Sequence, residues 1–177
     1  MLTQEEAYQF IRSRRFAVIS TTMEDGWPES ALIGIAVTRS LELVFDTIDS
    51  TRKCMNLRRD PRASLVIGWR GDYLAHTGGF ETIQYSGIAD EPIGAELEQL
   101  RATYFDAHPE GHSRETWPGL TYFRVRPRWL RYSTYYKPRV IAELTIEPGK
   151  AKPRDKGRVS DNPGNDTVAS ASGRSFS

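Results

Sequence analysis

Short runs of alternating apolar and polar residues, separated by turn-forming dipeptides, are the feature that most limits the folds open to this chain. The segment FAVISTTMEDGWPESALIGIAV predicts strands over 16–23 and 29–37, which Asp-Gly and a proline join as a hairpin. Pro127 has no amide hydrogen for a central ladder, so it is expected to divide an aromatic-rich run into two strands. The strands predicted beyond the hairpin are 41–47, 63–69, 80–90 and the two parts of 120–136.

Helical signals are fewer and do not alternate regularly with the strands. Thr3 and Glu6 form a capping-box pattern that predicts a first helix ending at about Arg14. A second helix is expected to begin at about Arg52, and a third to cover 91–105, where apolar residues recur at helical spacing. This pattern predicts a mainly β, α+β domain whose strands form a mostly antiparallel barrel rather than a doubly wound parallel sheet.

Length and composition are typical of a globular domain. The chain has 177 residues, with 24 Lys and Arg against 23 Asp and Glu, so no overall basic field points to nucleic acid or to an anionic membrane. The one cysteine, Cys54, excludes a disulfide within the chain. The beginning of the sequence has no leader pattern, and its apolar runs fall short of the roughly 20 residues of a membrane span, so a cytoplasmic protein is expected.

Two basic residues, Arg52 and Lys53, occupy the first turn of the expected second helix. Ser50 and Thr51 before them favour the N-cap, which leaves backbone N–H groups available to an anion. Cations in a first turn oppose the helix dipole by about 0.3–1 kcal/mol each, whereas a bound phosphate makes them favourable. Asn56 lies one turn further on the same face. The pattern indicates a phosphate site, although basic pairs also occur in ordinary exposed first turns.

Several segments, in this order, resemble the pyridoxamine 5′-phosphate oxidase-like family of FMN-binding split β-barrels. They are the hairpin with its Asp-Gly-x-Pro turn, VFDT, TRKCMNLRRDPRASLVIG, YSGIAD and YFRVRPRWLRY. The resemblance implies a six-stranded antiparallel split β-barrel with a few short flanking helices, in an FMN-binding domain over 1–146. Residues 147–177 are rich in Pro, Gly, Lys, Ser, Asn and Asp and are expected to form a disordered polar tail.

The resemblance also implies where FMN would bind. Thr51, Arg52 and Lys53 would hold its phosphate, with Ser50 and Asn56 beside them. Asp46 and Thr47 would lie next to the ribityl chain or the ring, and the backbone of 31–34 would line the isoalloxazine edge.

One further cofactor contact and an assembly follow from the same resemblance. Either Thr82 or Gln84, which share a face of the strand before Gly87, would reach the cofactor. Family members bind flavin at a subunit interface, so a homodimer that acts on a small-molecule substrate is expected.

The sequence departs from true pyridoxamine phosphate oxidases where those enzymes hold their substrate. YYKPRVIAEL contains Arg139 but lacks the histidine of the expected Arg-x-His pair, and Ser133 stands near the place of an expected tryptophan. These differences disfavour vitamin B6 oxidation and favour an FMN-dependent reductase or oxidase of unknown substrate. No catalytic residue is predicted, because flavin chemistry of this class requires no catalytic acid or base from the sequence. No metal site is predicted either, because His108 and His112 fall in a segment expected to be a solvated loop.

Three other uses of such a barrel remain open. The deazaflavin F420 carries a phosphate that the same basic residues would bind, and haem-like tetrapyrroles are a third cofactor class. A nucleic-acid-binding barrel would use RSRR and LRRDPR with the aromatic residues of 129–136, but the near-neutral total charge disfavours it.

Overall fold

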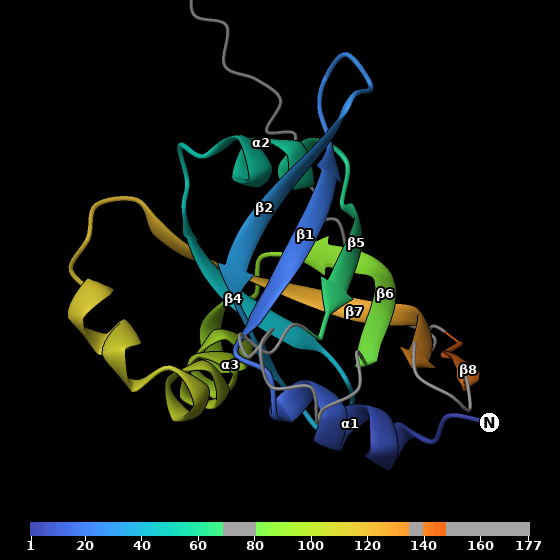
Figure 1. Ribbon diagram of the computed structural model, residues 1–177. Helices are drawn as coiled ribbons and strands as arrows, with labels where there is room; N and C mark the ends of the chain where they lie inside the picture. The colour runs from blue at the N-terminus through green and yellow to red at the C-terminus, as the bar shows by residue number, and fades with distance from the viewer. Residues whose placement is uncertain (69–80, 135–139, 148–177) are drawn as a thin grey trace, which may run out of the picture.

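The computed structural model describes residues 1–68, 81–134 and 140–147, and these form one antiparallel sheet with helices around it (Figure 1). The expected tail therefore lies, apart from Glu147, outside the described residues. No described helix is both long enough and apolar enough to cross a membrane. In chain order the elements are α1 (Gln4–Arg12), β1 (Phe16–Thr22), β2 (Pro28–Gly34), β3 (Ala36–Val37), β4 (Leu43–Ile48), α2 (Arg52–Arg59), β5 (Arg62–Ile67), β6 (Glu81–Asp90), α3 (Gly94–Ala107), the 3-10 helix η1 (Pro109–Arg114), β7 (Leu120–Thr134) and β8 (Ile141–Thr145).

The sheet has the order β2-β1-β5-β6-β7-β4-β3, with β8 paired to β7, and every pairing is antiparallel. It curls into a half-barrel, so the predicted α+β split barrel is confirmed (Figure 1). The predicted number of six strands was wrong, because the described part of the chain forms eight. Buried Ile35 lies between β2, which pairs with β1, and β3, which pairs with β4, so the predicted strand 29–37 is divided into two.

Strand β7 runs unbroken through Pro127, so the prediction of two strands there was wrong. The ladder between β6 and β7 has a bulge at this point: Gly87 pairs with Pro127 and Ser86 with Trp129. A bulge leaves local groups unpaired, which lets a central strand accept a residue without an amide hydrogen. Glycine is required at 87, since a Cβ there would lie 2.3 Å from the carbonyl oxygen of Arg126.

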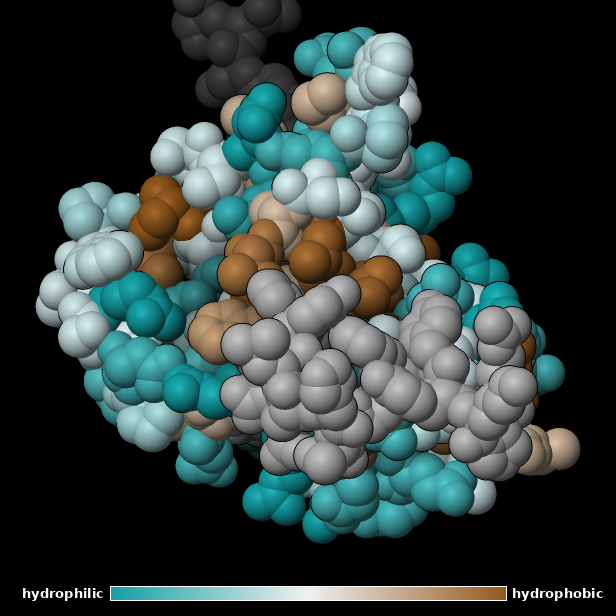
Figure 2. Space-filling view, viewed as in Figure 1, coloured by the Kyte–Doolittle hydropathy of each residue, from teal (hydrophilic) through white to brown (hydrophobic). Residues whose placement is uncertain are grey.

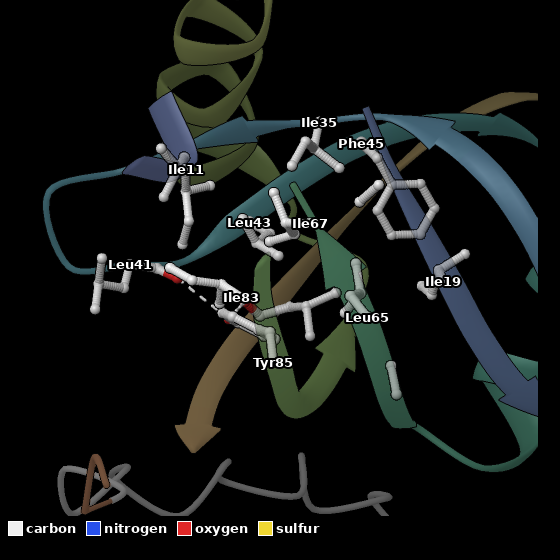
Figure 3. Close-up of a cluster of buried hydrophobic side chains, with 14 of the residues drawn as sticks. Ile11, Ile19, Ile35, Leu41, Leu43, Phe45, Leu65, Ile67, Ile83 and Tyr85 are labelled. Carbon is white, nitrogen blue, oxygen red and sulfur yellow. Dashed lines mark hydrogen bonds between the residues drawn. The ribbon is translucent and has the colours of Figure 1, made fainter. Parts of the chain in front are cut away.

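The core lies inside the curled sheet and is closed at one end by α1. Figure 3 shows Ile11 of α1 together with side chains from β1, β4, β5 and β6. Tyr85 is fully buried there, and its hydroxyl donates to the carbonyls of Leu41 (3.1 Å) and Val125 (2.7 Å). Burial raises the pKa of Tyr85 well above its ordinary value, so the hydroxyl stays protonated and keeps both partners.

A second, smaller cluster lies under α3, where Leu100 and Tyr104 pack against residues of β3, β4 and β7. It anchors α3 and the following η1. The expectation of a solvated loop here was wrong for His108, whose side chain is 2 % exposed. Its Nε2 donates to the carbonyl of Ile35 (2.9 Å), which fixes the junction of α3 and η1 against the end of β2.

Candidate functional site

The first turn of α2 forms as predicted, with Thr51 at the N-cap and Arg52 as the first helical residue. The Thr51 side chain makes no hydrogen bond to the helix N–H groups. Its hydroxyl instead donates to the carbonyl of Ile48 (2.8 Å) and lies 3.1 Å from the hydroxyl of Thr47. The N–H groups of this turn therefore remain without a side-chain cap, as an anion-binding helix terminus requires.

A groove of about 270 Å³ lies beside this turn and brings together several of the predicted site residues. Asp46, Thr47, Thr51 and Lys53 all line it, along with Leu32, Ile33 and Gly34 of the expected backbone stretch. The remaining lining residues are the apolar Ile48, Leu120 and Trp117 and one further charged group, Arg114. The groove thus combines cations, hydroxyl groups and apolar surface, which are the components of a site for a planar anionic ligand.

Arg52 and Asn56 lie beside the groove and do not line it. Arg52 pairs with Glu29 of β2 at 3.1 Å, and its own side chain is 72 % exposed. Asn56 is buried and donates to Glu29 (2.8 Å) and to the hydroxyl of Thr21 (3.0 Å). The amide of Asn56 therefore positions the Glu29 carboxylate, and this carboxylate in turn pairs with Arg52. Sequence reasoning missed Glu29, because nothing distinguishes it from the other polar positions of an alternating strand.

Asp46 is engaged by two residues that the sequence did not nominate. Tyr104 of α3 donates to its Oδ1 (2.7 Å), while Nε of Arg114, at the end of η1, donates to its Oδ2 (2.9 Å). Nη2 of Arg114 also donates to the Tyr104 hydroxyl (3.2 Å). Burial and the hydrogen bond to Asp46 raise the pKa of Tyr104, so it remains a donor. These partners lie about sixty residues away in sequence, which is why no local pattern could reveal them.

Gly34 belongs to the backbone stretch expected to line the isoalloxazine edge, and in the structure side chains of α3 and of its C-cap approach it closely. A Cβ at this position would lie 3.1 Å from Cε1 of His108 and 3.3 Å from the Tyr104 hydroxyl. The glycine lets α3 and η1 pack tightly onto β2, which in turn brings Arg114 to the groove.

Thr82 and Gln84 lie on β6, away from this groove, and Gln84 is exposed. The strand register nevertheless connects Gln84 to the rim of the groove: Leu32, Val18, Val66 and Gln84 are successive neighbours across β2, β1, β5 and β6. The three apolar members of this row are all exposed, and Leu32 is 65 % exposed. Figure 2 shows hydrophobic side chains gathered over β2, β1 and β5 on the face toward the viewer.

Ser50, the remaining predicted site residue, is exposed in the turn between β4 and α2 and is not part of the groove lining. Among the residues that the structure describes, no cluster of His, Cys, Asp and Glu is arranged to hold a metal ion.

Comparison with solved structures finds the same fold in proteins of low sequence identity. A haem-binding protein from Mycobacterium smegmatis has a TM-score of 0.70 at 20 % identity, over 82 % of this chain and 59 % of that protein. HutZ, the haem storage protein of Vibrio cholerae, has a TM-score of 0.61 at 14 % identity, over 72 % of this chain and 92 % of its own. An FAD-binding protein from Mesorhizobium loti has a TM-score of 0.60 at 17 % identity, over 74 % and 92 % of the two chains.

The family comparison gives a direct assignment. None of the curated proteins compared with the chain matches it. The family model described as pyridoxamine 5′-phosphate oxidase, however, matches residues 3–146, which include every described strand. The chain therefore belongs to the pyridoxamine 5′-phosphate oxidase family, in agreement with its split barrel. It is a divergent member, because its identity to structural relatives is low.

Proposed function

We propose that this protein binds FMN in the groove between β2, β4 and α2 and acts as an FMN-dependent oxidoreductase on a small molecule. The observation that carries the proposal is the first turn of α2, whose N–H groups have no side-chain cap and whose Lys53 lines the groove. A phosphate bound there would accept hydrogen bonds from those N–H groups and a charged contact from Lys53.

The rest of the groove suits the other parts of a flavin nucleotide. The hydroxyl oxygens of Thr47 and Thr51 can accept hydrogen bonds from a polyol chain, and the apolar side chains of Ile33, Ile48 and Leu120 offer a surface for a ring. Bound FMN would supply hydride acceptance and donation, while the residues of this chain bind and orient it and limit its contact with water. Arg139, which stands where true pyridoxamine phosphate oxidases have their substrate-binding Arg-x-His pair, lies outside the described residues.

Arg52 would join the phosphate site by turning from Glu29. The Arg52 side chain is largely exposed, so its pair with Glu29 is worth only about 0–1 kcal/mol and does not prevent this. Arg52 can then offer two parallel N–H groups to a phosphate, whereas Lys53 acts as a point charge.

A homodimer is part of the same proposal. The exposed apolar row of Val18, Leu32 and Val66 needs cover, and it extends from the rim of the groove to Gln84. A second copy of the chain packed on this row would place Thr82 or Gln84 of one subunit near the groove of the other. The expected cytoplasmic location also belongs to this proposal.

The test is flavin titration of the purified protein, followed by fluorescence quenching. Wild type is expected to bind FMN more tightly than riboflavin, which lacks the phosphate. Arg52→Ala combined with Lys53→Ala should weaken FMN binding by about tenfold or more, because charge-assisted contacts are lost, and should leave riboflavin binding unchanged. Arg58→Ala is the matched control, since Arg58 is on the same helix but pairs with Glu91. Undiminished FMN affinity in the folded double variant would rule out the phosphate site.

Haem is the second candidate, and it is favoured by two structural relatives, the haem-binding protein of Mycobacterium smegmatis and HutZ. A bound haem iron normally has an axial His, Cys, Met or Tyr ligand, and none of these residue types lines the groove in the described part of the chain. The absorbance spectrum separates the candidates: FMN gives flavin bands in the blue, F420 absorbs at shorter wavelength, and haem gives a sharp Soret band.

A further inference from the structure

Arg114 is held at the groove by two side chains that leave part of its guanidinium unused. Its Nε and Nη2 both contact Oδ2 of Asp46 at 2.9 Å, and Nη2 also reaches the hydroxyl of Tyr104. An arginine side chain carries five N–H donors, and the two on Nη1 have no partner among the described residues. Because Arg114 lines the groove and is 24 % exposed, these two donors are accessible to a ligand.

The supporting residues fix Arg114 firmly. Tyr104 is buried and donates to the oxygen of Asp46 that Arg114 leaves free, so both carboxylate oxygens have partners. Asp46 belongs to β4, inside the sheet, and its side chain is 12 % exposed. The pairing pre-organises Arg114, so a ligand that binds it does not have to order a flexible side chain.

The charges of the groove show what kind of ligand it suits. Asp46, Lys53 and Arg114 are the charged residues among the described lining, and Arg114 neutralises Asp46. Lys53, on α2, therefore provides the excess positive charge of the groove. Arg114, on η1, lies at a different wall, where its unused N–H groups can donate to neutral acceptors of a ligand. Figure 1 shows α2 well separated from the yellow segment that follows α3 and contains η1.

We propose that Arg114 is a specificity-determining residue of the groove: held by Asp46 and Tyr104, it donates from Nη1 to the carbonyl-bearing edge of a ring system whose phosphate is bound at α2. This inference rests on the proposed function and adds to it the residue that recognises the ring of the bound ligand, at the end of the groove away from the phosphate. Asp46 then acts as a positioning residue.

Comparison of FMN with riboflavin tests this inference, because the two ligands share the ring and differ in the phosphate. Arg114→Gln is expected to raise the dissociation constants of both by the same factor, about tenfold, as loss of one charge-assisted hydrogen bond predicts. Lys53→Ala should raise the value for FMN only. Arg101→Gln is the matched control: Arg101 is 26 % exposed and paired with Glu115, and it is not part of the groove lining.

Arg114→Lys provides a second variant in case Arg114→Gln does not fold. Lysine keeps the charge but lacks the planar fork, so it cannot hold Asp46 and Tyr104 and also bind the ring, and both flavins should bind more weakly. An unchanged riboflavin dissociation constant in the folded variants, or an effect on FMN alone, would overturn the assignment of Arg114 to the ring. Failure of wild type to bind either flavin would instead overturn the proposed function, and this inference with it.

Discussion

Replacement of Asn56 by leucine is expected to lower the free energy of unfolding by about 2–4 kcal/mol. Asn56 is buried, and its amide nitrogen is the donor for Glu29 and for Thr21. A hydrogen bond to a charged acceptor contributes about 1.5–3 kcal/mol and one to a neutral acceptor about 0.5–1.5 kcal/mol. Leucine has the same branched heavy-atom skeleton as asparagine with bulkier methyl groups, so the substitution leaves no cavity, and any crowding adds to the loss of the hydrogen bonds.

Glu29→Gln is the matched comparison, because glutamine keeps a carbonyl that can accept from Asn56. The hydrogen bond from Asn56 is kept but its acceptor becomes neutral, which costs about 1–1.5 kcal/mol, and the ion pair with the exposed Arg52 contributes about 0–1 kcal/mol. The structure therefore predicts that Asn56→Leu destabilises the protein clearly more than Glu29→Gln does.

Urea unfolding of both variants and of wild type measures the difference. All samples should have the same protein concentration, so that any association contributes equally, and the slope against urea should be unchanged. An equal or larger effect of Glu29→Gln would refute the reasoning, since it would mean that the exposed ion pair, and not the buried amide, joins β2 to α2.

Three further predictions concern the barrel and its edges. Tyr85→Phe should cost about 1–2 kcal/mol in urea unfolding, because two buried carbonyl groups share its hydroxyl as donor. Gly87→Ala should destabilise more than Gly34→Ala, since the added Cβ would lie 2.3 Å from a backbone oxygen at position 87 but 3.1 Å from a side-chain ring at 34; equal melting temperatures would contradict this. Hydrogen bonds from Arg62 lower the pKa of Asp60 from 3.8 to about 2, so its contribution to stability is complete above about pH 4 and is lost as the pH falls toward 2. Asp60→Asn should remove that part of the acid dependence when urea midpoints are compared across this range, and an unchanged pH profile would show that the pair is not stabilising.

The local elements of the fold were predictable because their signals are local. The capping box of Thr3 and Glu6 forms as expected, although the helix ends at Arg12 and not at Arg14. The hairpin of β1 and β2 and the start of α2 also follow from the sequence. Pro127 misled the prediction, because the bulge that accommodates it depends on Gly87 in another strand.

The candidate site divides in the same way between local and distant contributions. Thr47, Thr51 and Lys53 are within seven positions of one another, and the strand–turn–helix that contains them places them at one groove. The same local reasoning predicted Asn56 beside the phosphate, but its side-chain amide is hydrogen-bonded to Thr21 and Glu29. A helical period predicts the face of a residue but not the partner that this face meets.

By itself, the sequence determined the strand-rich architecture, the position of α2 and a basic helix terminus suited to phosphate, because alternation, caps and turns act over a few residues. Only the tertiary structure decided which groups meet in the groove. Asp46 is joined to Tyr104 and Arg114 because Gly34 lets α3 and η1 approach the sheet, and such contacts depend on how distant segments pack. Packing also decided that Arg52 rests against Glu29 while Lys53 faces the groove, since neighbouring residues on a helix point in different directions.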